Sequence, residues 1–479
     1  MQEAPYGAQA TQKGFVMGGW RFDNSYARLP ETLFERCVPT PVKAPETLVW
    51  NAALAARLGL DGVGADVLAG NVLAEGSEPI AQAYAGHQFG HPNMLGDGRQ
   101  VLLGEQMAPD GARLDVALKG SGRTRYSRSG DGRAALGPML REYVVSEAMA
   151  AMGVPTTRSL AVVATGERVL REDILPGAVL VRVAASHIRV GTFQYAAALE
   201  DGTVLRALAD HALARHYPDV PAGDYLGLLK GVVGAQARLI AAWMRVGFVH
   251  GVMNSDNMTI SGETIDYGPC AFLEGYGRDV VFSSIDHGGR YAFGNQPRMA
   301  LWNLTRLAES LLPLLGPDGT AQATAVLEEF PKLFEAAWLQ AMGGKLGLAA
   351  PGEADVALIS GVLDWLEGSG LDHTNFWRGL ADGLEGKAAL PEAEWVAGWL
   401  ARLGDRATAA GLIRASAPAV VPRNHKVEAA LKAAEAGDMA PFRALVEAVR
   451  APYAETAENA QFRQPAAPHE AVRQTFCGT

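Results

Sequence analysis

The chain has 479 residues, of which 48% are apolar and 20% are charged, and its formal net charge is −10. This composition is typical of a folded globular protein and excludes a largely disordered chain. The acidic balance argues against nonspecific binding to nucleic acid or to an anionic membrane, because both partners require a broad basic field. Three cysteines, Cys37, Cys270 and Cys477, are too few for a disulfide framework of the secreted kind.

The first twenty residues contain neither the apolar core of a signal peptide nor an Arg-rich amphipathic stretch. No apolar run in the sequence is long enough to span a bilayer. We therefore expect a cytoplasmic protein that has no membrane partner.

The predicted elements divide the chain into four parts. Residues 1–80 are expected to form an N-terminal extension packed on the two lobes of the protein, with a helix over 46–58. Residues 81–190 contain short β-like runs separated by turns at Pro109-Asp110-Gly111 and Thr165-Gly166, which predict an antiparallel sheet. One helix, expected over 138–152, lies within this part and carries Glu142.

From residue 191 to about 450 the pattern is mostly helical, with amphipathic segments at 205–216, 225–246, 299–315 and 320–342. Residues 451–479, which include Cys477, are rich in Ala, Glu, Gln and Pro and are expected to form a tail over the surface. A sheet-rich lobe with one helix, followed by a helical lobe, is the order of a protein-kinase-like bilobal fold. The expected class is α+β.

The segment His250–Met258, HGVMNSDNM, follows one of these helices and is followed by Asp266-Tyr267-Gly268. The intervening residues predict a β-hairpin with its turn at Ser261-Gly262. Carboxylate and amide oxygens suit Mg²⁺, and a nearby carboxylate can accept a hydroxyl proton. Asn257 and Asp266 are therefore candidate metal ligands, and Asp256 is the candidate base. Either short motif alone is more often a turn or a helix cap.

A second cluster, ALKGSGRTRYSRSGDGR, begins where Lys119 ends a predicted strand. Glycines allow backbone N–H groups to approach phosphate oxygens, and cationic side chains neutralise their charge, so polyphosphate is the expected ligand. Glu142 could pair with Lys119 as a helix Glu pairs with the strand Lys in a kinase. The four arginines of this cluster are Arg123, Arg125, Arg128 and Arg133.

The order of these parts departs from that of a protein kinase. The richest glycine segment follows Lys119, although the turn Gly96-Asp97-Gly98-Arg99 precedes it, and Arg182 and Arg189 add further cations. We interpret the surplus of arginine as a deep site for the phosphate tail, which would leave the α-phosphate near the acceptor. That arrangement favours nucleotidyl transfer, with pyrophosphate as leaving group, over phosphoryl transfer.

FDNSYARLPE, YAGHQFGH, LGDGR, LKGSGRTRYSRSGDGR and HGVMNSDNM are long motifs spread over residues 22–266. On these motifs the chain closely resembles selenoprotein O, a pseudokinase-like family of protein adenylyltransferases. The resemblance implies transfer of AMP from ATP to Ser, Thr or Tyr hydroxyls of proteins, with ATP flipped relative to a kinase.

Carried over to this sequence, the resemblance implies a specific set of roles. Asp256 would accept the proton, Asn257 and Asp266 would bind Mg²⁺, with Mn²⁺ as the alternative ion, and Glu142 would pair with Lys119 or with a metal. The residues expected to hold ATP are Gly96, Gly98, Arg99, Lys119, Asp131, Gly132, Arg182, Arg189 and Asp266. A Cys270–Cys477 disulfide that acts as a redox switch is also implied, with two unpaired thiols as the alternative.

Two other functions would use the same residues. An ATP-dependent phosphotransferase would bind the nucleotide in the opposite direction, and a pseudokinase scaffold would bind ATP without catalysis. A pure binding module needs no candidate base, so Asp256 argues against the scaffold.

Overall fold

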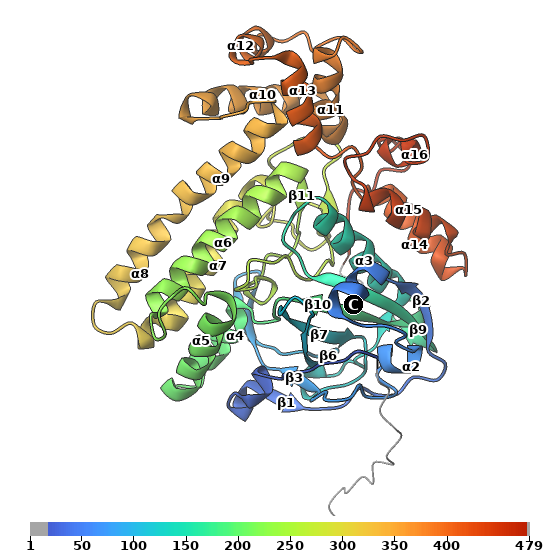
Figure 1. Ribbon diagram of the computed structural model, residues 1–479, viewed down its shortest axis with the longest axis vertical. Coiled ribbons are helices and arrows are strands. Elements are labelled where there is room, and N and C mark those ends of the chain that lie inside the picture. Colours follow the sequence, from blue (N-terminus) through green and yellow to red (C-terminus); the bar gives the residue numbers. More distant parts are fainter. Residues whose placement is uncertain (1–17, 477–479) are drawn as a thin grey trace, which may run out of the picture.

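The computed structural model describes residues 18–476, which form an α+β protein (Figure 1). Most strands precede residue 190 and most helices follow it, as expected. The main sheet is antiparallel in the order β1-β3-β6-β7-β10-β9-β2, with the short β8 paired to β10. Its strands are β1 (Phe34–Arg36), β2 (Glu46–Trp50), β3 (Ile80–Gln82), β6 (Gln100–Met107), β7 (Arg113–Lys119), β8 (Ala134–Ala135), β9 (Arg158–Leu170) and β10 (Ile174–Ala184).

The sheet register places three polar side chains of the later site on one face. Lys119 of β7 pairs with Gln100 of β6, and Arg182 of β10 pairs with Ala117. Since side chains alternate between the faces of a strand, Gln100, Lys119 and Arg182 share a face. That face also packs against α3 (Leu136–Ala151), and the opposite face covers a separate core with α1 (Ala52–Leu58) and α2 (Ala65–Leu68).

Long helices make up most of the remaining chain. α6 lies against α7 and α9, while α14 and α15 pack on α3. Beyond the far end of α9, helices α10–α13 gather around a second core (Figure 1). The bounds are α4 (Val190–Ala198), α5 (Gly202–His216), α6 (Tyr225–Val246), α7 (Gln296–Leu311), α8 (Gly319–Glu328), α9 (Phe330–Lys345), α10 (Val356–Ser369), α11 (His373–Leu384), α12 (Trp395–Arg402), α13 (Arg406–Ser416), α14 (Asn424–Glu435), α15 (Ala440–Arg450) and α16 (Ala460–Arg463).

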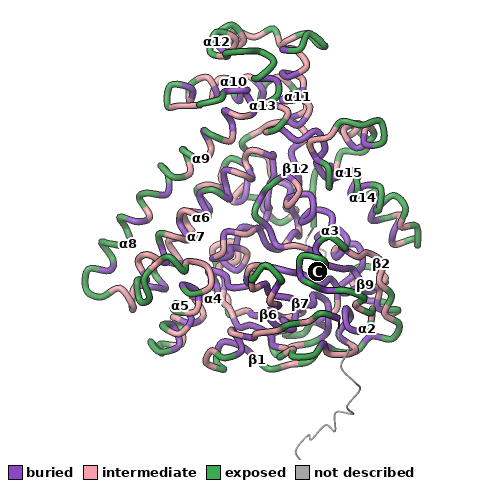
Figure 2. Tube along the Cα trace, in the orientation of Figure 1, coloured by how far each residue is buried: buried purple, intermediate pink, exposed green. Residues whose placement is uncertain are grey.

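Burial follows this arrangement. Figure 2 shows buried residues concentrated in the sheet and along the inner parts of α6 and α7, with exposed turns along α8 and α9. Two short strand pairs lie outside the main sheet: β4 (Ala85–Gln88) with β5 (His91–Met94), and β11 (Phe248–Val249) with β12 (Ala271–Phe272). Within residues 18–476, no helix is long and apolar enough to cross a membrane.

The structure corrects three local predictions. The helix expected over 46–58 is a strand, Glu46–Trp50, followed by α1, because residues 46–50 pair with β9 at the sheet edge. Residues 1–80 are expected only to pack on the lobes, but they contribute β1 and β2 to the main sheet. Thr165-Gly166 is no turn: Gly166 has a φ of 68°, and β9 runs through it, opposite a register shift in β10. The segment expected as one helix over 320–342 is two helices, α8 and α9.

Candidate active site

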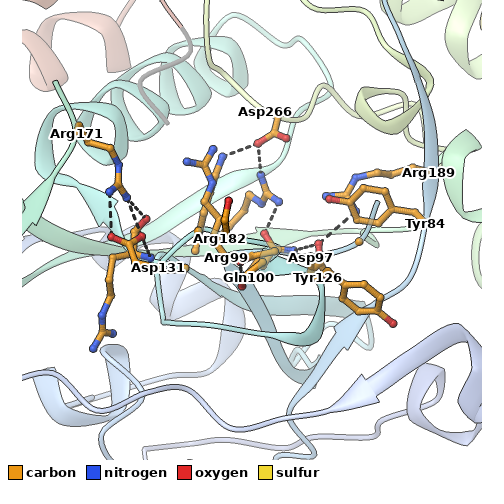
Figure 3. Close-up of a pocket in the computed structure, with 18 of the residues that line it drawn as sticks. Tyr84, Asp97, Arg99, Gln100, Tyr126, Asp131, Arg171, Arg182, Arg189 and Asp266 are labelled. Atoms are coloured by element: carbon orange, nitrogen blue, oxygen red, sulfur yellow. Dashed lines mark hydrogen bonds and ion pairs between the residues drawn. The ribbon is translucent and has the colours of Figure 1, made fainter. Parts of the chain in front are cut away.

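A cavity of about 710 Å³ lies between the sheet and the segment that follows α6 (Figure 3). Every residue expected to hold ATP lines this cavity: Gly96, Gly98, Arg99, Lys119, Asp131, Gly132, Arg182, Arg189 and Asp266. They come from β7, β10 and four separate loops. The tertiary structure therefore brings this whole set together.

Lys119, at the end of β7, lies between two carboxylates. Its Nζ donates to Oε2 of Glu142 and to Oδ1 of Asp266, both at 2.5 Å. Burial alone would raise the pKa of Glu142, but the charges of Lys119 and Arg182 hold it below its ordinary value. Burial also opposes the charge of Asp266, but the charges of Lys119, Arg182 and Arg189 together lower the pKa of this carboxyl. Both carboxyls are thus ionised and form one cluster with the cations.

Arg182 is almost completely buried and uses its guanidinium in several directions. Nη1 donates to Glu142 Oε1 at 3.0 Å and to Asp266 Oδ1 at 3.1 Å, and Nη2 donates to Gln100. A planar guanidinium held on several sides presents its remaining edge in a fixed direction. Arg182 also lines the cavity.

Arg189 occupies another wall of the cavity. Its guanidinium lies 4.3 Å from the ring centroid of Tyr84, and its Nη1 is 3.6 Å from Asp97 Oδ1. The Nε of Arg189 is buried without a hydrogen-bond partner among the described residues. A buried donor without an acceptor is costly, so a bound anion at this wall would be stabilised.

The glycine-rich side of the cavity depends on close contacts. A Cβ on Gly96, which has a φ of 148°, would lie 2.3 Å from the Tyr126 ring. Nearby, Asp131 is paired with Arg171: both oxygens of Asp131 accept hydrogen bonds from the guanidinium of Arg171, each at 3.0 Å. Asp131 therefore orients Arg171, whose guanidinium adds a cation to this rim (Figure 3).

Asp256 differs from the other candidates because it lines no part of the large cavity. It lies in a short 3-10 turn, Ser255–Asn257, beneath the β4–β5 hairpin. A Cβ on Gly86 would lie 2.2 Å from Asp256 Oδ1, and this oxygen is buried without a hydrogen-bond partner among the described residues. Burial raises the pKa of the Asp256 carboxyl to about 6. Near neutral pH it is mostly ionised and more basic than an exposed Asp.

Asn257 lines a smaller adjoining cavity, together with Glu142 and Asp266. Its Nδ2 donates to Val252 O at 3.1 Å, which leaves the side-chain oxygen without a protein donor in the described part of the chain. Asp266 likewise uses only Oδ1 in its contacts with Lys119 and Arg182. Two hard oxygen donors thus remain at one small space, and this donor set fits Mg²⁺.

Asp266 follows a turn whose form differs from the prediction. The residues between Asn257 and Asp266 do not pair with each other as a hairpin: Thr259 bridges to Arg189 and Thr264 bridges to Thr156. Each of the two segments therefore pairs with a more distant part of the chain. The Thr259 hydroxyl donates to Glu263 O at 2.7 Å and closes the turn. The turn at residues 261–262 does occur.

Two features fix the backbone at Asp266. His250 Nε2 donates to the preceding carbonyl, Ile265 O, at 2.9 Å. Asp266 itself has a φ of 65°, in the left-handed region that Asp tolerates better than most residues. Non-glycine residues in this region concentrate at functional sites, where the surrounding structure holds them.

Some cavity residues were missed by sequence reasoning, and some expected cations lie elsewhere. Tyr84, Gln100, Tyr126 and Arg171 line the cavity, yet no spacing to the predicted motifs marks them. The only available signal was that Tyr84 begins the motif YAGHQFGH and Tyr126 lies within the basic cluster. Of the four arginines in that cluster, only Arg133 lines the cavity; the other three, Arg123, Arg125 and Arg128, lie outside it.

Cys270 is buried just beyond the site. Burial raises the pKa of its thiol to about 11. Cys477 lies outside the described residues, so the expected Cys270–Cys477 pairing remains a prediction. Thr475, two residues before Cys477, donates from Oγ1 to Pro269 O at 2.6 Å, so the C-terminal segment reaches the residue next to Cys270.

Comparison with known proteins shows the family of this chain. The family model described as protein adenylyltransferase SelO matches residues 19–450. The chain is 55% identical to the protein nucleotidyltransferase YdiU of Geobacillus kaustophilus, over 96% of this chain and 99% of that protein. It is 53% identical to the YdiU protein of Brevibacillus brevis, over 98% and 99% of the two chains. The chain therefore belongs to the SelO family of protein adenylyltransferases, enzymes that carry out nucleotidyl transfer to proteins.

Proposed function

We propose that this enzyme transfers AMP from ATP to Ser, Thr or Tyr hydroxyls of proteins, in a protein-kinase-like cleft between a sheet-rich and a helical lobe. The observation that carries the proposal is the convergence of six cations on one cavity, Arg99, Lys119, Arg133, Arg171, Arg182 and Arg189. Three acids, Asp97, Asp131 and Asp266, line the same cavity, so the cations exceed the acids by three. This surplus of positive charge supports a deeply held phosphate tail.

In this reaction the acceptor hydroxyl oxygen attacks the α-phosphorus of ATP and forms a new P–O bond. The bond between the α-phosphorus and the bridging oxygen breaks, and pyrophosphate carries away the electron pair. Asp256 accepts the hydroxyl proton, a role supported by its raised pKa of about 6 and by its place next to Asn257, which lines the adjoining small cavity. The cations near the phosphate tail stabilise the leaving pyrophosphate.

Asn257 and Asp266 are the residues that would hold Mg²⁺. The ion, when bound, would neutralise phosphate charge. Lys119 is held toward Asp266 by Glu142, so the cation and the candidate metal ligand keep a fixed separation. Gly96 permits Tyr126 to close one wall of the cavity, and Asp131 holds Arg171 at its rim.

Labelled ATP tests this proposal. The enzyme is incubated with Mg²⁺, an extract of soluble proteins, and ATP labelled on either the α- or the γ-phosphate. We expect α-label on protein, lost in both Asp256→Asn and Asp266→Ala. Transfer of γ-label alone would instead establish a kinase. ATP binding without transfer of either label would establish a scaffold.

A further inference from the structure

His187 lies behind the cavity wall and does not border the cavity itself. It is fully buried, between Asp115 of β7 and Arg182 of β10. Its Nδ1 is 2.9 Å from Asp115 Oδ2, and its backbone N–H donates to the same oxygen at 2.8 Å. On the other side of the ring, Arg182 Nε lies 3.2 Å from His187 Nε2.

These contacts determine the protonation of the ring. An arginine Nε–H can only donate, so His187 Nε2 must carry a lone pair. The remaining nitrogen, Nδ1, must then hold the proton that is donated to Asp115. The ring is therefore neutral, and the lowered pKa of His187, caused chiefly by burial, agrees with this state.

Asp115 is kept as an ionised acceptor by a helix beyond the sheet. Arg215, in the last turn of α5, donates to Asp115 Oδ1 and to Glu105 Oε2, each at 2.6 Å. Burial opposes the charge of Asp115, but Arg215 and His187 hold its pKa well below the ordinary value. A chain of hydrogen bonds thus runs from α5 through Asp115 and His187 to Arg182.

We propose that His187 is a positioning residue for nucleotidyl transfer, whose neutral ring fixes the guanidinium plane of Arg182 by accepting its Nε–H. This inference rests on the proposed function, because it assigns Arg182 to the phosphate tail of ATP. Glu142, Asp266 and Gln100 hold the two Nη atoms, and His187 supplies the contact at Nε.

The Nε contact has a distinct consequence. Without an acceptor at His187 Nε2, the Nε–H of Arg182 would be buried and unpaired, which favours rotation of the guanidinium away from its present plane. Lys119 and Asp266 would then lose the fixed neighbour that sets their relative positions. His187 acts only through Arg182 in this scheme and touches neither ATP nor the acceptor.

Two substitutions separate this role from a structural one. The amide of Asn reaches the position of His Nδ1, whereas the amide of Gln reaches that of Nε2. His187→Asn therefore keeps the contact with Asp115 and removes the acceptor for Arg182. His187→Gln places its carbonyl oxygen where Arg182 needs it. A positioning role predicts that His187→Gln binds nucleotide more tightly than His187→Asn. A structural role through Asp115 predicts the reverse order of affinity.

The primary measurement is the Kd of α,β-methylene ATP with Mg²⁺, which needs no turnover. For His187→Asn we expect Kd to rise by about tenfold or more, because a rotated Arg182 guanidinium loses its hydrogen bond to the charged phosphate tail. His187→Gln should recover most of this affinity. In the transfer assay, KM for ATP should follow the same order, while KM for the acceptor proteins should stay the same in both variants.

Thermal unfolding of both variants shows whether either effect reflects a loss of folding. The inference is overturned if His187→Asn binds the analogue as tightly as the original enzyme, or if His187→Gln is the weaker of the two. It is also overturned if nitrogen NMR finds the His187 ring doubly protonated at pH 7. Absence of α-label transfer by the unaltered enzyme would refute the proposed function, while the analogue measurement would still decide the role of His187.

Discussion

Glu142→Gln tests the charge cluster at the centre of the site. The Glu142 side chain is 3% exposed, and its two oxygens accept from Lys119 and Arg182 at 2.5 and 3.0 Å. The substitution keeps the shape but leaves two buried cations with one carboxylate, Asp266. Removing one partner of a buried ion pair costs about 3 to 5 kcal/mol. We expect the free energy of unfolding to fall by about 3 kcal/mol, since Asp266 still compensates part of the charge.

Bound nucleotide should offset this loss. The phosphates of ATP supply negative charge to Lys119 and Arg182, so MgATP should raise the unfolding temperature more in Glu142→Gln than in the unaltered enzyme. Glu147→Gln is the matched control. Glu147 lies on the same helix, is equally buried, and pairs with Arg158 away from the cavity. Its substitution should lower stability by a similar amount, with no extra stabilisation by MgATP.

Thermal unfolding with and without MgATP is the assay. Our reasoning would be refuted if Glu142→Gln were as stable as the original enzyme, because the cluster would then contribute nothing to folding. It would equally be refuted if MgATP stabilised Glu142→Gln and Glu147→Gln alike. The second result would mean that the phosphates do not contact Lys119 and Arg182.

Three further predictions concern Glu263, Gly86 and Asp131. Burial raises the pKa of Glu263 from 4.5 to about 7, so the folded state holds a proton that the unfolded chain has lost, and stability should fall as pH rises from 4.5 to 7. This difference in pKa corresponds to about 3 kcal/mol of folding free energy. Urea unfolding at several pH values should show that Glu263→Gln removes this pH dependence of stability. An unchanged pH profile in Glu263→Gln would contradict the prediction. Gly86→Ala places a Cβ 2.2 Å from Asp256 Oδ1, so we expect α-label transfer to fall by about tenfold or more; normal transfer would show that the β4–β5 hairpin can move aside without cost. Asp131→Asn weakens the paired contacts with Arg171, and we expect KM for ATP to rise by about threefold to tenfold, with Arg171→Gln giving a similar rise; a rise for Asp131→Asn alone would mean that Asp131 contacts the nucleotide directly.

Much of the candidate site could be predicted because its signals are local. Lys119 ends an apolar strand, Glu142 lies in a helix bounded by Gly153 and Pro155, and Asp256, Asn257 and Asp266 fall within eleven residues of one another. Strand alternation and helical periodicity are set by neighbouring residues, so these elements appear in the sequence before any tertiary contact is known.

Predictions failed where distant segments decide the conformation. Residues 46–50 have a helical pattern, yet they pair with β9, and Thr264 pairs with Thr156 instead of completing a hairpin. Strand pairing over such separations depends on which edges the rest of the fold leaves open. Local propensity carries no information about that choice.

The residue types already predict the chemistry available to this protein: a candidate base, two candidate oxygen ligands, and cations beside glycines. Their arrangement follows only from the fold. The fold placed Asp256 beneath the β4–β5 hairpin, joined Asp131 to Arg171, and set His187 behind Arg182. The physical reason is that side-chain types fix which bonds can form, whereas sheet register and packing fix which partners meet.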